Sequence, residues 1–156
     1  MVTIMHGGKY MNEDTINLLR EAIVGCKMGI NTLDAVLPKV DNDKLREFLE
    51  TMLRKNTEIM VDMSICLYRK NEESKEPMKM AREMAKFTID MKTRCEDADK
   101  KIISIVVDGC NMGIKKLEEN ILECETAEKC ASDNVRKLIA LLQECKDRLN
   151  NREYLN

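Results

Sequence analysis

The sequence predicts an all-α fold, and three features of its 156 residues lead to that prediction. Aromatic residues make up only 3% of the chain, and six Gly and two Pro stand against 12 Met, a composition that favours helices over strands. Apolar residues recur at alternating spacings of three and four, as in helices that pack in a bundle. The phrase GCKMGI at 25–30 returns as GCNMGI at 109–114, 84 positions later, which indicates two copies of one helical unit.

The first copy is predicted to be a helical hairpin over residues 12–71. Its first helix, 12–38, carries an apolar seam and ends at Pro38. The polar run DND at 41–43 then caps a second helix over 43–71, which continues the same apolar spacing. Because the turn between the two helices is short, we expect them to be antiparallel neighbours.

The second copy is predicted to be a hairpin over residues 98–150, with helices at 98–125 and 131–150. Both repeat the seam of the first hairpin at spacings of four and three. Between the hairpins, a charged break is followed by a shorter amphipathic pattern, which predicts an extra helix in the central linker at 77–95.

One domain accounts for most of the chain. A single hairpin cannot bury its apolar face, so we expect two stacked hairpins to close an antiparallel up-down four-helix bundle over 12–156. Residues 1–11, which contain the only His, His6, are expected to be a disordered N-terminal extension. The helical pattern begins after them, with Asn12 or Asp14 as N-cap.

Small and polar residues within the helices have structural interpretations. Gly25, Gly29, Gly109 and Gly113 flank the repeated Cys and would let neighbouring helices approach closely. Asn56 is the one polar residue on the seam of its helix, and it is expected to fix the register through a buried hydrogen bond. A small polar pocket is the alternative.

Charge and hydropathy exclude several functions. The 26 basic and 28 acidic residues are interleaved, with a net charge of −2, so no basic stripe for nucleic acid is expected. No apolar run approaches the roughly 18 residues of a membrane span, and no signal peptide pattern is present, so we expect a cytoplasmic protein. Phosphate loops, nucleophile elbows and Cys-His pairs are also missing from the sequence.

The layout resembles the uncharacterised, rubrerythrin-related ferritin-like proteins of bacteria. The segments that carry the resemblance are LLREAIVGCKMGINTLDAVLPKVDNDKLREFLETML at 18–53 and VVDGCNMGIKKLEEN at 106–120. It implies a ferritin-like bundle of two helical hairpins whose linker contains a short extra helix. Such a resemblance implies a fold and leaves the function open.

Enzymes of that class would hold two metal ions with one Glu on each of two helices and a Glu-x-x-His on each of the others. Here Val61 and Asp147 stand where the two His would be, and the carboxylates lie off the apolar seams. We therefore do not expect an intact dimetal centre. The four nearest candidates are Glu21, Glu58, Asp108 and Glu144.

Seven cysteines make the chain cysteine-rich, without any C-x-x-C pair. A turn near residue 127 would set Cys110 opposite Cys145, and Cys124 opposite Cys130. These two levels would lie ~21 Å apart, too far for one four-thiolate site. Each could be a disulfide, a site for a soft metal such as copper or zinc, or two small buried hydrophobes; an odd count in a cytosolic chain favours the last.

A second apolar stripe in the second hairpin points to an interaction surface. It would be covered by the linker helix or by a second copy in a homodimer. Its residues are Ile102, Ile105, Gly109 and Met112.

Together these features favour a non-catalytic structural or protein-interaction module that uses no cofactor. One alternative is a cysteine-based redox sensor or soft-metal protein, and another is a degenerate dimetal-carboxylate oxidase or peroxidase.

Overall fold

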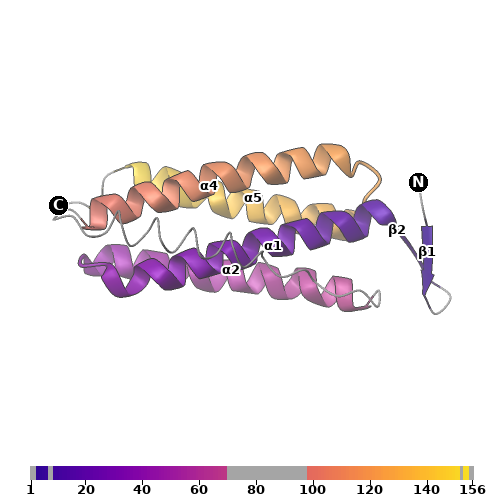
Figure 1. The fold of residues 1–156 in the computed structure, drawn as a ribbon, viewed down its shortest axis with the longest axis horizontal. Helices are drawn as coiled ribbons and strands as arrows, with labels where there is room; N and C mark the ends of the chain where they lie inside the picture. The colour runs from indigo at the N-terminus through magenta and orange to yellow at the C-terminus, as the bar shows by residue number, and fades with distance from the viewer. Residues whose placement is uncertain (1–2, 7–8, 70–97, 152, 155–156) are drawn as a thin grey trace.

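Four long α-helices lie lengthwise side by side and make up the body of the molecule (Figure 1). The computed structural model describes residues 3–6, 9–69, 98–151 and 153–154, so the linker helix predicted at 77–95 lies outside the described residues. The prediction of an all-helical body is confirmed for the described part of the chain. The helices are α1 (Glu13–Val36), α2 (Asp43–Arg69), α4 (Ala98–Glu123) and α5 (Lys129–Asn150).

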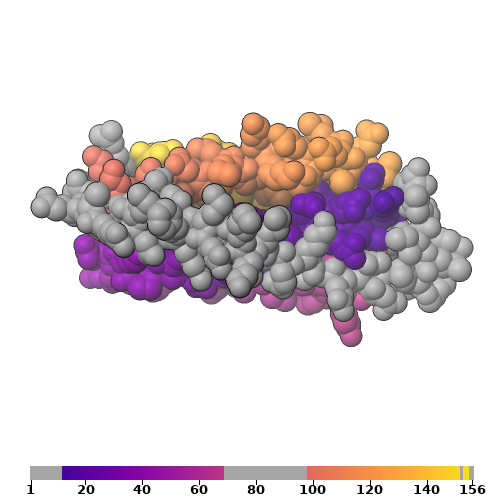
Figure 2. Space-filling model, in the orientation of Figure 1, coloured from indigo at the N-terminus to yellow at the C-terminus, as the bar shows by residue number. Residues whose placement is uncertain are grey.

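The helices pack α1 on α2 and α4 on α5, and the two pairs meet through α1 with α4 and α2 with α5. On the face shown in the space-filling view, α4 forms the upper edge and α1 and α2 the lower edge (Figure 2). Among the described helices, none combines the length and the apolar character needed to cross a membrane.

The ends of α1 follow the sequence closely. Asn12 is its N-cap, and the Asn12 Oδ1 accepts a hydrogen bond from the backbone N–H of Thr15 at 2.8 Å. At the other end the chain tightens into a 3-10 turn over Leu37–Lys39, which contains Pro38. Proline is tolerated there because the first turn of a helix leaves its N–H groups unpaired.

A β-hairpin precedes the helices, where the sequence predicts a disordered extension over residues 1–11. Strand β1 (Thr3–His6) pairs antiparallel with β2 (Lys9–Asn12), with His6 opposite Lys9. The sequence between the strands is Gly-Gly, a combination that suits short hairpin connections. The prediction of disorder did not take this Gly-Gly signal into account.

The start of α1 lies beside the end of α4. The Asp14 carboxylate accepts a hydrogen bond from the hydroxyl of Thr126 and another from its backbone N–H, the latter at 3.1 Å. These two bonds, the hydroxyl bond first, lower the pKa of Asp14 below its usual value. The backbone N–H of Glu128 donates to Thr15 Oγ1 at 2.8 Å. This contact holds the residue before α5, which starts at Lys129, two residues earlier than predicted.

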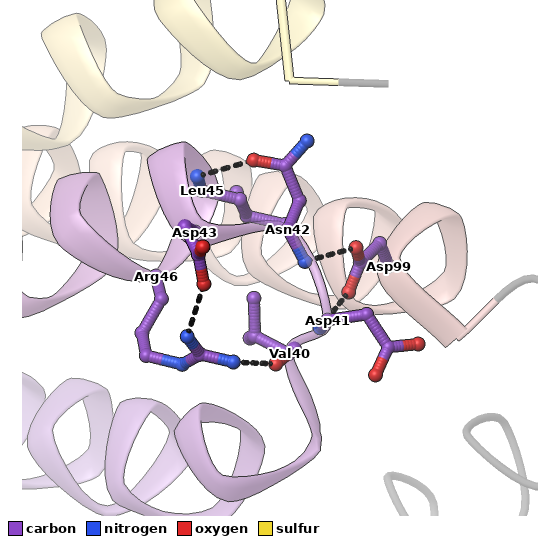
Figure 3. Close-up of polar contacts among 7 residues, drawn as sticks. All are labelled: Val40, Asp41, Asn42, Asp43, Leu45, Arg46 and Asp99. Atoms are coloured by element: carbon purple, nitrogen blue, oxygen red, sulfur yellow. Dashed lines mark hydrogen bonds and ion pairs between the residues drawn. The ribbon is translucent and has the colours of Figure 1, made fainter. Parts of the chain in front are cut away.

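At the opposite end, Asp99 joins the start of α4 to the start of α2 (Figure 3). Its two carboxylate oxygens accept hydrogen bonds from the backbone N–H groups of Asp41 and Asn42, each at 2.8 Å. The side chain of Arg46 donates to the carbonyl of Val40 in the same turn. One carboxylate thus caps two otherwise unpaired N–H groups and ties the two helical pairs together.

The core consists of two apolar clusters, one toward each end of the bundle. Buried positions extend beyond the predicted seams. The seam predicted on α4 includes Ile103, Val107 and Cys110, but Val107 is half-buried and its neighbour Val106 is buried. Each helix touches more than one neighbour, so a wider face is covered than in a two-helix seam. Fully buried residues at seam positions include Leu19, Ile23, Leu45, Leu49, Leu138 and Leu149.

The glycines of the repeated phrase divide into two kinds. A Cβ atom at Gly29 would lie 2.9 Å from Asn56 Nδ2, and one at Gly113 would lie 3.0 Å from Leu142 Cδ1. These glycines permit the close helix approach that the sequence predicted. At the other two, no described atom outside the local helix lies within 4 Å of such a Cβ, so the prediction is wrong for Gly25 and Gly109.

Asn56 is buried and reaches from α2 to α1. Its Nδ2 donates to the carbonyl oxygen of Cys26 at 3.3 Å, while its Oδ1 has no hydrogen-bond partner among the described residues. The interhelical bond agrees with the predicted register-fixing role, since a shift of α2 along α1 would break it.

Candidate functional site

The cysteines offer the most reactive chemistry in the described part of the chain. The six described cysteines are thiols, and Cys95 lies outside the described residues. Exposure separates them into three groups. Cys26, Cys110 and Cys145 are buried in the core, Cys66 and Cys124 are half-buried, and Cys130 is exposed.

Cys110 of α4 and Cys145 of α5 meet inside the core, as the hairpin geometry predicts. Each is 4% exposed, and their thiols share a hydrogen bond. That bond lowers the pKa of Cys110, because a thiolate there accepts from the neighbouring S–H. The same bond, together with burial, raises the pKa of Cys145. The pair can therefore lose a first proton more easily than a second.

Cys130 meets a different cysteine from the one predicted. Its Sγ lies 3.3 Å from the Sγ of Cys66, near the end of α2, whereas the sequence predicts that Cys130 lies opposite Cys124. The difference arises because α4 ends at Glu123, so Cys124 sits in the turn and not on a helix that faces α5. Cys130 is in the first turn of α5 and contacts the neighbouring helical pair.

The remaining described cysteines are held in the protonated form. Burial raises the pKa of Cys26 to about 12. The pKa of Cys124 is raised by burial and by the nearby carboxylates of Asp14, Glu123 and Glu21. A thiol with a raised pKa is a poor nucleophile, since the thiolate is the reactive species.

The four candidate dimetal carboxylates lie outside the core. Glu58 is 62% exposed at its side chain and pairs with Arg54 on its own helix at 3.1 Å. Glu144 is 43% exposed and lies 4.0 Å from Lys55. Asp108 is exposed and Glu21 is half-buried. Within the described ranges, no three His, Cys, Asp or Glu side chains gather into a group that could hold a metal ion.

The predicted interaction stripe on α4 is not a continuous exposed surface. Ile102 is fully buried and Ile105 packs against the core, while Met112 is 72% exposed and Gly109 is exposed. Ile102 and Ile105 are therefore covered within the chain, which is one of the two outcomes predicted for the stripe.

An outward apolar stripe lies instead on α2. Val61 and Ile65 are each 44% exposed and Tyr68 is 79% exposed, at spacings of four and three along one side of the helix. This stripe was not predicted, although its apolar spacing can be seen in the sequence on the face of α2 opposite the seam. We call these three residues the α2 stripe.

No family model, curated protein or solved structure matches this chain.

Proposed function

We propose that this chain is a non-catalytic structural or protein-interaction module that associates with a second copy of itself. Its scaffold is a four-helix bundle of the ferritin-like type with antiparallel neighbours, built from two repeated hairpins. Asp14 bonds to Thr126, so α1 starts where α4 ends, which supports an antiparallel arrangement of these neighbours. Asp99 bonds to the turn before α2, so α2 and α4 start at the same end and run in the same direction. The order of directions along the chain is therefore up-down-down-up, and the predicted up-down alternation is wrong at this step.

The observation that carries this proposal is the α2 stripe. Large apolar side chains in a continuous outward row are costly to leave in water, and such rows often mark protein contacts. The carboxylates expected in a dimetal enzyme give no comparable support for catalysis, because Glu58 and Glu144 are occupied by surface ion pairs.

A second copy suits the α2 stripe because its surroundings are self-complementary in charge. Arg54 and Glu58 pair at 3.1 Å on the same side of α2, so both signs border the stripe. In a two-fold dimer, a patch with both charges and an apolar centre can pair with itself. The small net charge of −2 adds little repulsion between copies.

The experiment is sedimentation equilibrium at micromolar concentrations under reducing conditions. The wild-type chain should be a dimer, and the double variant Val61→Ser with Ile65→Ser should be a monomer with unchanged helicity. Met112→Ser, at another exposed apolar side chain, is the matched control and should stay dimeric. A monomeric wild type, or a dimeric double variant, would contradict self-association through the α2 stripe. Stoichiometric iron or manganese in purified protein would contradict the non-catalytic assignment.

A second candidate function is binding of copper(I) by Cys110 and Cys145. The hydrogen-bonded thiol pair favours it, since two thiolates suffice for linear copper(I), whereas structural zinc takes four ligands. Competition with a colorimetric copper(I) chelator tests it. Cys145→Ala should abolish binding, while Cys26→Ala, at another buried cysteine, should retain it. Equal binding by both variants would exclude this site.

A further inference from the structure

Cys66 and Cys130 form a second thiol pair whose geometry differs from that of a metal site. Their sulfur atoms are 3.3 Å apart. A disulfide bond is about 2.05 Å long, whereas two thiolates that share one metal ion, each about 2.3 Å from it, stand roughly 4 Å apart. The observed separation is shorter than the metal arrangement requires, and small side-chain rotations would bring it to bonding distance.

Access also distinguishes this pair from the other thiols. Cys130 is exposed and Cys66 is half-buried, whereas Cys110 and Cys145 are each 4% exposed. A dissolved oxidant can therefore reach the Cys66–Cys130 pair without opening the core. Both pairs consist of two cysteines, but only the Cys66–Cys130 pair is open to solvent. The buried Cys110–Cys145 pair can therefore serve as an internal control.

We propose that Cys66 and Cys130 are a redox modification site that forms a reversible disulfide by exchange with a small dissolved disulfide such as oxidised glutathione. The thiolate of Cys130 attacks one sulfur of glutathione disulfide, which gives a mixed disulfide and releases one glutathione thiolate. The thiolate of Cys66 then attacks the Cys130 sulfur and releases the second glutathione. Two protein thiols are oxidised and one small disulfide is reduced to two thiols, so atoms and electrons balance.

The consequence of this bond is a covalent link between the two helical pairs. Cys66 is near the end of α2 and Cys130 is in the first turn of α5, 64 positions later in the chain. A bond there would close a long loop that contains the whole linker between the pairs. Long loops lose much chain entropy when they are closed in the unfolded state, so the oxidised form should be harder to unfold.

The experiment uses the full chain in buffers with a graded ratio of reduced to oxidised glutathione. After acid quenching and alkylation, the thiol count should fall by two, and mass spectrometry should find the Cys66 and Cys130 peptides joined. The midpoint of thermal unfolding should rise by several degrees and should return when dithiothreitol is added. Circular dichroism checks that each variant is folded.

Three serine variants make the test specific. Cys66→Ser and Cys130→Ser should each abolish the two-thiol loss and the thermal shift, while Cys124→Ser, close by in the chain, should keep both. A bridge to any other cysteine, bound glutathione without a bridge, or a bridge between two chains would overturn the proposal. Since dimerisation through the α2 stripe is measured under reducing conditions, the two proposals fail or succeed separately.

Discussion

Both copies of the repeated phrase are helical, one in α1 and one in α4, but their glycines contact different side chains. In α1, Gly29 makes room for the amide of Asn56, which bonds to α1 across the core. In α4, the matching Gly113 makes room for the Cδ1 methyl group of Leu142. The same close approach therefore serves a directional polar contact in one hairpin and plain apolar packing in the other.

The cysteines of the two copies differ in the same way. Cys26 has a pKa raised to about 12 by burial, while the matching Cys110 shares a hydrogen bond with Cys145 that lowers its pKa. Cysteines at matching positions of the repeat thus differ in the direction of their pKa shift. The repeated phrase therefore sets how closely the two helices of a hairpin approach. The side chain on the second helix of each hairpin determines which contact is made there.

The largest expected effect comes from making the second hairpin resemble the first. Leu142→Asn should lower the free energy of unfolding by about 2 kcal/mol, because it removes apolar contacts and places an amide in an apolar setting. Urea unfolding at neutral pH measures it. The reciprocal Asn56→Leu is the control and should stay within about 1 kcal/mol of wild type, since it loses one hydrogen bond but also the unpaired Oδ1.

If Leu142→Asn costs less than about 0.5 kcal/mol, the new amide has found a partner on α4. The contact at Gly113 would then accept an amide as the contact at Gly29 does, and the two hairpins would not differ in this respect.

Alkaline pH should separate the two repeated cysteines. The pKa of Cys26 is about 12 in the folded chain and near 9.0 when unfolded, so the folded state binds more protons between these values. Its contribution to stability is fully present below pH 9 and is lost as pH rises toward 12, by up to about 1.4 kcal/mol per pH unit. Urea unfolding at pH 8, 9 and 10 under reducing conditions measures the slope.

The Cys26→Ala variant supplies the reference for that slope. It should be less stable at pH 8 because of its small cavity, but its stability should fall less steeply above pH 9. Parallel curves for the variant and wild type would show that Cys26 does not keep its proton in the folded chain.

The smallest expected effects concern glycines of the repeated phrase. Gly29→Ala should destabilise by about 1 kcal/mol, because the new Cβ meets the buried amide of Asn56 and overpacking outweighs the gain in helix propensity. Gly25→Ala, four residues earlier and open to solvent, should instead stabilise by about 0.5–1 kcal/mol. Thermal unfolding of the two variants side by side measures both. Changes of the same sign would contradict the division into two kinds of glycine.

Apolar spacing and turn residues alone determined the four described helices and most contacts within each hairpin, although the predicted Cys124–Cys130 pairing was wrong. The seam residues are mostly buried, Asn12 caps α1, and Asn56 bonds across to α1. The meeting of Cys110 and Cys145 also followed from sequence, because a short turn fixes which positions on its two helices lie side by side.

Only the tertiary structure decided the contacts between hairpins. The Cys66–Cys130 pair joins residues 64 positions apart, and the α2 stripe faces outward, whereas Ile102 of the predicted stripe is buried. No short turn sets the register between α2 and α5. The relative height and rotation of α2 and α5 depend on the packing of many side chains from different parts of the chain. A local sequence pattern does not specify that packing.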